Sequence, residues 1–481
     1  MTDFNTIFKF FKAYDMRGTV PHLTADVYYL SAKALITEIL QADNLPLNIN
    51  LCHDCRYSSP EFYQAFYSGL IDAGATVQAI GVGATEIIYA AAQVNNATSV
   101  IITASHNPKD DNGFKIVKQY PQMLGLDAGL DKIRDYVIDE LKNGFELKNI
   151  NLKDVTEDEN FKTTVIQKWL DVYHKIGKTE IINNTLVSDN KQLKIVVDTA
   201  NGMGGYLMKF IQNLYSNIEF IPMFWELDGT FPNHEANPTL DENIIMLQAK
   251  VRVVNADLGV AFDGDADRCY FIDQNGGRLN GEFLVPAFAK YLLNELNQSP
   301  NPTFDRAIVF PIPYSRATLD TVFENNGVPV VTRQGHTFIK AEMKKYNAVY
   351  GGEASGHHYF GEFGYMDSGA LTLALMIRIL VESKKPASET LNYWNKRYFV
   401  TGEHNFKLPA GLTLEIVKEK LKNEYSDGQI SELDGITFYY PDWKFTVRGS
   451  NTEPLIRVNV ETKKDNRAFE KLEEIKTIIG I

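Results

Sequence analysis

Three carboxylates, Asp263, Asp265 and Asp267, stand at alternate positions in the segment DGDADR, directly after an apolar stretch. Carboxylates this close repel one another unless a hard cation neutralises them. A set of oxygen ligands favours Mg²⁺, which completes its octahedron with phosphate or water oxygens. An EF-hand calcium loop is excluded, because its sixth position would be Arg268 and its twelfth Gln274. The segment is therefore predicted to bind one Mg²⁺, with a solvated acidic turn as the plain alternative.

Ser105 is the predicted nucleophile. It lies in the segment TASHNP, after the apolar residues 100–102, and is followed by His106. A serine beside a histidine in a turn is usually a local cap, so the pair alone is weak evidence. Next to a magnesium site, however, the serine oxygen or its phosphate could supply a further metal ligand. Lys115 is close enough in sequence to reach the same anion.

Two further loops have side chains suited to a phosphosugar. In GGEASGH, residues 351–357, Glu353 and Ser355 offer acceptors and donors for sugar hydroxyls, and His357 could act as acid or base near neutral pH. A structural turn is the alternative for this loop. The segment RGSNTEP begins at Arg448, and its arginine fork, hydroxyls and N–H groups suit a phosphate that does not react.

The first four-fifths of the chain repeats one plan three times, a strand, a helix, a second strand, a second helix and a third strand. The first strands are predicted at 47–52, 193–198 and 307–310, and the second strands at 75–80, 218–223 and 328–332. The second helices are predicted at 85–95, 241–250 and 336–345. Each third strand runs into one of the loops at 99–108, 256–268 and 348–357. This order predicts mainly parallel mixed sheets, with the loops at the carboxyl ends of the strands.

The last part of the chain follows a different plan. Strands are expected at 436–450 and 455–462, with helices at about 413–424 and 466–478. The fold class is thus α/β, with three similar α/β domains and a smaller C-terminal α+β domain around a central cleft. The expected domains are 1–155 with the serine loop, 156–277 with the metal loop, 278–396 with the sugar loop, and 397–481 with the phosphate loop.

Composition narrows the function classes. The net charge of −13 gives no overall basic field, so no nucleic-acid partner is expected. Three cysteines cannot form a disulfide framework for 481 residues, and Cys52 and Cys55 are a lone C-x-x-C pair without zinc or redox context. No signal peptide or membrane segment is recognised, so a cytoplasmic enzyme without a membrane partner is expected. The oligomeric state is left open.

Five motifs in order resemble the α-D-phosphohexomutase family, most closely its bacterial phosphomannomutase branch. They are KAYDMRG at 12–18, TASHNP, DGDADR, GEASGH and RGSNTEP, and they cover nearly the whole chain. The resemblance implies a phosphoserine at Ser105, which also contacts the metal bound by Asp263, Asp265 and Asp267, and transition-state stabilisation by Arg268 and Lys115. It also implies substrate contacts from Tyr14, Arg17, Arg333, His336, Glu353, Ser355, His357, Arg448, Ser450, Asn451, Thr452 and Arg457.

The implied reaction interconverts mannose 6-phosphate and mannose 1-phosphate through a hexose 1,6-bisphosphate, which serves as intermediate and activator. Phosphoglucomutase or phosphoglucosamine mutase activity is the alternative, with a magnesium-dependent sugar phosphatase or a sugar-phosphate sensor ranked lower. The chain departs from several relatives at 310–313, which reads FPIP where those relatives place a basic residue after the strand. A sugar contact there is in doubt, and Arg316 or Arg333 is a possible substitute.

Overall fold

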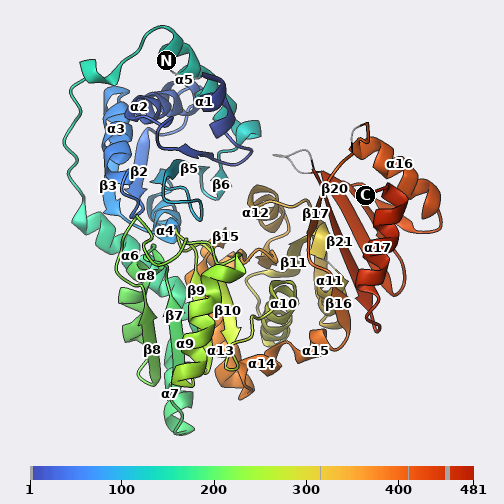
Figure 1. Cartoon of the computed structure of the whole chain (residues 1–481). Coiled ribbons are helices and arrows are strands. Elements are labelled where there is room, and N and C mark those ends of the chain that lie inside the picture. The colour runs from blue at the N-terminus through green and yellow to red at the C-terminus, as the bar shows by residue number, and fades with distance from the viewer. Residues whose placement is uncertain (1–3, 315, 410, 450–454) are drawn as a thin grey trace. The chain divides into compact units, whose positions relative to one another are not determined.

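The protein is described by a computed structural model that covers residues 4–314, 316–409, 411–449 and 455–481 (Figure 1). It divides into two compact units. Unit 1 extends to Arg278 and also contains Glu362–Ala387, and unit 2 contains Leu279–Gly361 and Ser388–Ile481. Within the described ranges the strands form sheets with the strand orders given below, and helices pack on them, which confirms the predicted α/β class.

The first sheet of unit 1 has the order β1-β5-β4-β2-β3. Strands β4, β2 and β3 are parallel, and β5 is antiparallel to its neighbours β4 and β1. Its strands are β1 (Met16–Thr19), β2 (Asn48–His53), β3 (Thr76–Val82), β4 (Thr98–Ile102), β5 (Asp111–Gln119) and β6 (Gln122–Met123), which pairs with β5. Its helices are α2 (Ala25–Ala34), α3 (Ser59–Asp72), α4 (Thr85–Asn95) and α5 (Leu130–Lys142). Every residue of β4 is buried, as expected for a central strand covered on both faces.

The second sheet of unit 1 has the order β10-β9-β7-β8, with β9, β7 and β8 parallel and β10 antiparallel. The strands are β7 (Leu193–Asp198), β8 (Ile218–Met223), β9 (Leu258–Phe262) and β10 (Cys269–Asp273). The associated helices are α6 (Glu159–Gly177), α7 (Thr179–Ser188), α8 (Gly204–Ile211), α9 (Ile245–Val254) and α13 (Gly369–Ser383). The turn between β9 and β10 contains the DGDADR segment, so this hairpin positions the predicted metal ligands.

Unit 2 contains a mixed sheet and an antiparallel sheet. In the mixed sheet, β12 (Val328–Thr332), β11 (Asp305–Pro311) and β13 (Ala348–Gly352) are parallel, and β14 (His358–Phe360) is antiparallel to β13. Its helices are α10 (Gly281–Gln298), α11 (Arg316–Glu324) and α12 (His336–Lys345). The antiparallel sheet has the order β16-β21-β20-β19-β18, with β17 also on β21. It consists of β16 (Tyr398–Val400), β17 (His404–Lys407), β18 (Gln429–Ser431), β19 (Ile436–Tyr439), β20 (Trp443–Gly449) and β21 (Leu455–Lys463), with α16 (Leu414–Glu424) and α17 (Ala468–Ile479).

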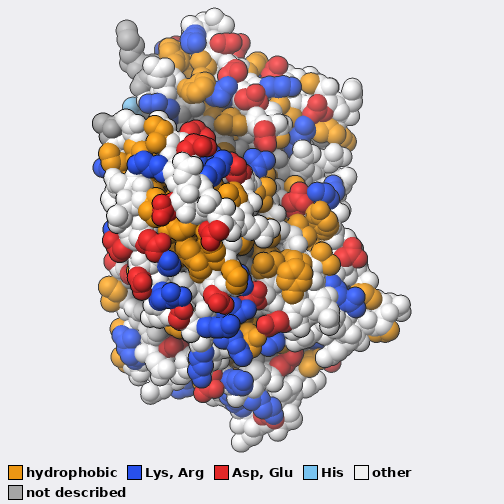
Figure 2. Space-filling model, turned by 90° about the vertical axis from the view of Figure 1, so that its right-hand side faces the viewer, with side chains coloured by type: hydrophobic (Ala, Val, Ile, Leu, Met, Phe, Trp, Pro, Cys, Tyr) orange, Lys and Arg blue, Asp and Glu red, His pale blue; other side chains and the backbone are white. Residues whose placement is uncertain are grey.

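The strands of the repeated plan occur where the apolar stretches predicted them, and two predictions need correction. The single strand expected at 436–450 is two antiparallel strands, β19 and β20, because Pro441 and Asp442 form a turn between them. The helix expected at 241–250 starts as a 3₁₀ turn at 241–244 and continues as α9. The surface in Figure 2 intersperses acidic, basic and apolar side chains. Within the described ranges, every helix lacks the length or apolarity that a bilayer crossing requires.

Candidate functional site

The serine loop follows β4 and is held in a left-handed backbone conformation. Ser105 has φ of 54°, and its residue is 2 % exposed. Non-glycine residues rarely adopt this conformation, so the surrounding structure must impose it. The Ser105 N–H donates to Thr103 Oγ1 at 3.0 Å, and the Thr103 hydroxyl donates to Asp54 Oδ2 at 2.6 Å. These two bonds fix the main-chain conformation of the loop at Ser105.

Arg56 is the main support of this loop, and the sequence analysis missed it. The residue is 1 % exposed, and its guanidinium donates to the carbonyls of Ser105 (2.8 Å), Asn107 (2.7 Å), Pro108 (2.6 Å) and Asp111 (2.9 Å). Its Nε lies 3.2 Å from a carboxylate oxygen of Asp54. These bonds tie the main chain on both sides of the serine to one buried side chain, although the Pro108 carbonyl also accepts from the Asp111 N–H at 3.0 Å. Because its acceptors belong to the main chain some 50 residues later, no side-chain motif could reveal this role.

The aspartate loop meets the serine loop closely. Asp263, Asp265 and Asp267 are 0 %, 0 % and 2 % exposed, and their candidate ligand oxygens lie within 4.8 Å of one another. The Ser105 hydroxyl donates to Asp263 Oδ2 at 3.2 Å. A Cβ added to Gly264 would lie 2.2 Å from the carbonyl oxygen of Ser105, so the loops approach closely at a residue without a side chain. The structure thus brings together the four residues predicted as metal ligands.

Two buried cations lie among these carboxylates. The Arg268 guanidinium donates to Asp263 Oδ2 through Nε (2.9 Å) and Nη2 (2.7 Å), contacts His106 Nδ1, and has Nη2 3.5 Å from Ser105 Oγ. The Lys115 ammonium, from β5, donates to Asp265 Oδ2 and Asp267 Oδ2, each at 2.6 Å. Arg268 therefore lies where it could contact a phosphate on Ser105, whereas Lys115 points at two of the predicted metal ligands.

The ionisation of the aspartates follows from burial and from these cations. Burial raises the pKa of Asp263 to about 7, with Arg268 acting against the rise and the other two carboxylates adding to it. Burial and Asp267 also oppose ionisation of Asp265, but Lys115 and the Thr85 hydroxyl, 2.6 Å away, hold its pKa below the usual range. Burial lowers the pKa of Lys115, but the two carboxylates outweigh it and keep the ammonium charged. The loop is therefore a set of opposed charges kept from water.

The aspartate loop fits a divalent cation. Asp265 Oδ1 is buried and has no hydrogen-bond partner among the described residues, although the other oxygen of the same carboxylate has two donors. When all three are ionised, the carboxylates carry one negative charge more than Arg268 and Lys115 together offset. Burial of a carboxylate oxygen without a hydrogen-bond donor costs free energy unless a cation binds to that oxygen. Anionic oxygens in this number and spacing suit Mg²⁺.

Other residues of unit 1 line the same region. Arg17, on β1, pairs with Asp15 at 2.7 Å and donates from Nη1 to the carbonyl of Ala104 and to Asn107 Oδ1, both at 3.3 Å. It therefore contacts the serine loop from the neighbouring strand. Tyr14, two residues before β1, is half-buried.

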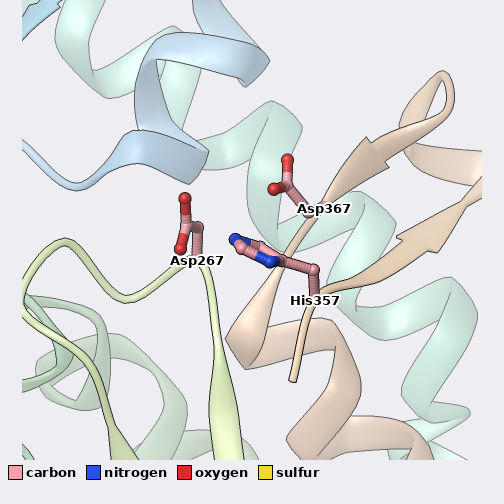
Figure 3. A group of neighbouring side chains, drawn as sticks. All are labelled: Asp267, His357 and Asp367. Atoms are coloured by element: carbon pink, nitrogen blue, oxygen red, sulfur yellow. The ribbon is translucent and has the colours of Figure 1, made fainter. Parts of the chain in front are cut away.

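A buried aspartate that the sequence analysis missed belongs to the same unit. Asp367, at the end of β15 (Met366–Asp367), is 2 % exposed. Figure 3 labels the side chains of Asp267, His357 and Asp367. Asp267 and Asp367 belong to unit 1, whereas His357 belongs to unit 2.

In unit 2, Glu353 follows β13 and is held by two donors. Its carboxylate accepts hydrogen bonds from Gln334 Nε2 and from the Tyr359 hydroxyl, each at 2.6 Å, and the residue is 3 % exposed. His357 Nδ1 lies 3.6 Å from Glu353 Oε2 and 3.5 Å from the Ser355 hydroxyl. The three residues predicted to meet the sugar are thus gathered in one turn, closed by the Glu353 N–H on the His357 carbonyl.

The remaining predicted substrate residues of unit 2 lie on two elements. Arg333 is exposed and stacks over the ring of Phe338, 4.5 Å from its centroid, and His336 is the first residue of α12. Arg448 and Arg457 both pair with Glu403, at 2.5 Å and 3.1 Å. The predicted contacts Ser450, Asn451 and Thr452 lie outside the described residues.

The FPIP departure has a local structural counterpart. Strand β11 ends at Pro311, and a 3₁₀ turn follows at Ile312–Tyr314. The Lys444 ammonium, from β20, donates to the carbonyls of Ile312 and Pro313 in this turn. Arg316, a possible substitute for the missing basic residue, donates instead to the carbonyls of Tyr440 and Pro441. Lys444 therefore supplies a basic side chain at the end of this strand, although the residue is fully buried.

These features together define an α/β phosphoryl-transfer protein with a serine beside a cation-binding aspartate loop. Family models of phosphoglucomutase/phosphomannomutase match along the chain, with α/β/α domain I at residues 9–143, domain II at 174–277, domain III at 280–398 and the C-terminal domain at 403–476. The chain belongs to the phosphoglucomutase/phosphomannomutase family, whose members are phosphohexomutases, that is, intramolecular phosphotransferases. The family is magnesium-dependent.

Relatives and a solved structure agree with this family over the full length. A phosphomannomutase of Vibrio cholerae is 33% identical, with 98% of each chain covered. A phosphomannomutase/phosphoglucomutase of Pseudomonas syringae is 35% identical over 94% of this chain and 91% of its own. The crystal structure of a phosphoglucomutase/phosphomannomutase family protein from Burkholderia thailandensis has a TM-score of 0.79 and 25% identity, and covers 100% of this chain and 98% of its own.

Proposed function

We propose that this chain is a phosphomannomutase that interconverts mannose 6-phosphate and mannose 1-phosphate, through a phosphorylated Ser105 and a hexose 1,6-bisphosphate. The observation that carries the proposal is the contact between Ser105 Oγ and Asp263 Oδ2 at 3.2 Å, within a buried set of carboxylates and cations. Phosphoryl transfer asks a protein mainly for alignment and charge stabilisation, and this arrangement offers both. The division into domains at 1–155, 156–277, 278–396 and 397–481 is part of the same proposal.

In the first half-reaction a hydroxyl of the sugar phosphate attacks the phosphorus on Ser105. The new P–O bond forms as the bond to Ser105 Oγ breaks, and the hydroxyl proton leaves to a base, for which His357 is the candidate. Arg268, 3.5 Å from Ser105 Oγ, would stabilise the charge on the moving phosphoryl group. Asp263, Asp265, Asp267 and the Ser105 oxygen would hold one Mg²⁺. When bound, Mg²⁺ would offset the charge of about −1.5 to −2 on the phosphoserine.

The bisphosphate then has to return its other phosphate to Ser105. Residues of unit 2 are proposed to hold the sugar and the phosphate that is not reacting. Glu353, Ser355 and His357 would meet the sugar, with Tyr14, Arg17, Arg333 and His336 around the substrate. Arg448, Ser450, Asn451, Thr452 and Arg457 would bind the distal phosphate. In the second half-reaction the phosphoryl group moves from the bisphosphate to Ser105 Oγ and the isomeric monophosphate leaves.

The sugar preference rests on the names of relatives, some of which combine both sugars. Glucose and mannose differ at carbon 2, and a single hydroxyl contact is worth about 1–3 kcal/mol, so some activity on glucose phosphates is expected. Phosphoglucomutase activity is therefore the second candidate. Coupled assays with mannose 6-phosphate, glucose 6-phosphate and glucosamine 6-phosphate decide between them. The highest kcat/KM is expected for mannose 6-phosphate. Steady release of inorganic phosphate instead of an isomer would contradict mutase activity.

A further inference from the structure

Two arginines of the antiparallel sheet in unit 2 share one carboxylate. Arg448 on β20 and Arg457 on β21 are direct cross-strand partners. Glu403, in the loop between β16 and β17, accepts a hydrogen bond from Arg448 Nη2 at its Oε2 (2.5 Å) and from Arg457 Nη1 at its Oε1 (3.1 Å). Like charges placed directly opposite on two strands repel each other. The carboxylate relieves this repulsion, with one oxygen for each guanidinium.

The position of the Glu403 carboxylate is set by the main chain around it. The Thr401 N–H donates to the carbonyl of Val460 at 3.0 Å, and the Thr401 hydroxyl accepts from the Val460 N–H at 3.1 Å. Gly402 follows with φ of 74°, a conformation that favours glycine. These contacts tie the loop to β21 at Thr401, two residues before Glu403. The contact with both arginines is therefore a built feature of the sheet.

The three side chains are accessible enough to exchange partners. The side chain of Arg448 is 12 % exposed, that of Arg457 29 % and that of Glu403 21 %. Breaking a fully buried pair leaves an uncompensated charge, but a pair with access to water can be replaced by another ligand at small cost. A phosphate monoester is the natural competitor, because an arginine fork binds carboxylate and phosphate with the same geometry.

We propose that Glu403 is a resident counter-anion that competes with the distal phosphate of the sugar for Arg448 and Arg457. This inference rests on the proposed function, because it concerns the same arginines. In that reaction the bisphosphate must leave its phosphate site and bind again in the opposite orientation. When the phosphate leaves, Glu403 returns to the arginines, so that two facing cations are never left unpaired. Glu403 thus lowers the affinity for phosphate and permits the reorientation; it is a positioning residue.

The test compares Glu403→Gln with Glu403→Asp and with Glu415→Gln, an exposed glutamate of α16 that pairs with Lys418 at 2.9 Å. Isothermal titration of inorganic phosphate and of mannose 1-phosphate measures affinity without turnover, and steady-state assays give KM and kcat. Loss of a competing charge is expected to tighten both ligands about five- to twentyfold in Glu403→Gln, with KM for mannose 6-phosphate and kcat both lower. Glu403→Asp is expected to stay close to the wild type, and Glu415→Gln to match it.

Weaker binding and a higher KM in Glu403→Gln would overturn the proposal, because they would mean that the carboxylate only aligns the arginines. Unchanged affinity would overturn it as well. A melting curve of each variant identifies any loss of fold. Glu403→Ala also removes the competing charge and retains the test if Glu403→Gln is unstable. The phosphate titration does not depend on mutase activity. An inactive wild type whose Glu403→Gln variant still binds phosphate more tightly would therefore refute the proposed function and leave the counter-anion role supported.

Discussion

The aspartate loop of unit 1 and the arginine pair of unit 2 have opposite arrangements of charge. In unit 1, three aspartates surround the ammonium of Lys115, and in unit 2, two arginines surround the carboxylate of Glu403. Lys115 is positively charged, as is the Mg²⁺ proposed for the aspartate loop. Glu403 is negatively charged, as is the phosphate proposed for the arginines. The difference is burial, because the side chain of Lys115 is 8 % exposed and that of Glu403 is 21 % exposed.

This difference in burial indicates which region keeps its ion pairs and which can exchange its internal ion for a ligand. A buried cation between carboxylates cannot leave without exposing uncompensated charge, so the aspartate loop keeps its geometry with or without a metal. A partly exposed carboxylate costs little to displace, so the arginine pair can alternate between Glu403 and a phosphate. A mutase needs both properties, a rigid centre for transfer and a phosphate site that releases its ligand.

The largest effect on activity is expected from Ser105→Ala, which removes the proposed carrier and leaves both internal ions in place. Turnover should fall about 10³-fold or more, because alanine has no hydroxyl oxygen to carry the phosphoryl group. The melting temperature should stay close to that of the wild type. Coupled assays and circular dichroism measure the two quantities, with Ser188→Ala on α7 as a matched control. Near-normal turnover in Ser105→Ala would refute the nucleophile.

The largest effect on stability is expected from Lys115→Met. This change leaves Asp265 and Asp267 buried without their shared donor, so the free energy of unfolding should fall by about 3–5 kcal/mol in the presence of a chelator. Mg²⁺ should recover part of the loss by supplying another cation. Urea unfolding with and without Mg²⁺ measures both values. Equal loss in the two conditions would mean that the metal does not bind at these carboxylates.

A smaller loss is expected from Arg56→Met. Four carbonyls each lose the hydrogen bond from Arg56, those of Ser105, Asn107, Pro108 and Asp111, at a cost of about 2–3 kcal/mol in the free energy of unfolding. Because the loop then holds Ser105 less firmly, kcat should fall more than KM changes. Arg56→Lys restores the positive charge without the branched guanidinium, so it should recover a small part of the lost free energy of unfolding. If kcat remained normal in Arg56→Met, Arg56 would have no role in positioning the serine.

The smallest effect on stability is expected from Glu403→Gln, and it sharpens the comparison with Lys115→Met. A partly exposed pair contributes about 0–1 kcal/mol, so the free energy of unfolding should change within that range. The same urea titration measures it. A loss as large as that in Lys115→Met would show that the two regions do not differ in the way their burial indicates.

The sequence predicted the positions of the loops well, because each motif directly follows an apolar stretch that forms a buried strand. The loops after β4, β9 and β13 are therefore where the pattern put them. Contacts between the loops of unit 1 were implied by the family resemblance, and the structure supplies their distances. The approach of Gly264 to the Ser105 carbonyl depends on the packing of two sheets, which no local pattern encodes.

Three functional details were beyond the sequence for physical reasons. Arg56 acts on main-chain carbonyls 49 to 55 residues away, and carbonyls have no sequence signature. Glu403 belongs to no motif and meets its arginines only because β16, β17 and β20 all belong to the sheet around β21. Lys115 was expected at the phosphoryl group, and no sequence pattern indicated that its ammonium also donates to Asp265 and Asp267. In each case long-range pairing decides the contact.

The central claim is that Ser105 carries the phosphoryl group. Mass spectrometry of the peptides released after incubation with hexose 1,6-bisphosphate and Mg²⁺ tests it most directly. We expect one phosphoryl group, on the peptide that contains Ser105, and its loss when a hexose monophosphate is then added. A phosphoryl group on another residue, or isomerisation with Ser105 unmodified throughout, would contradict the account.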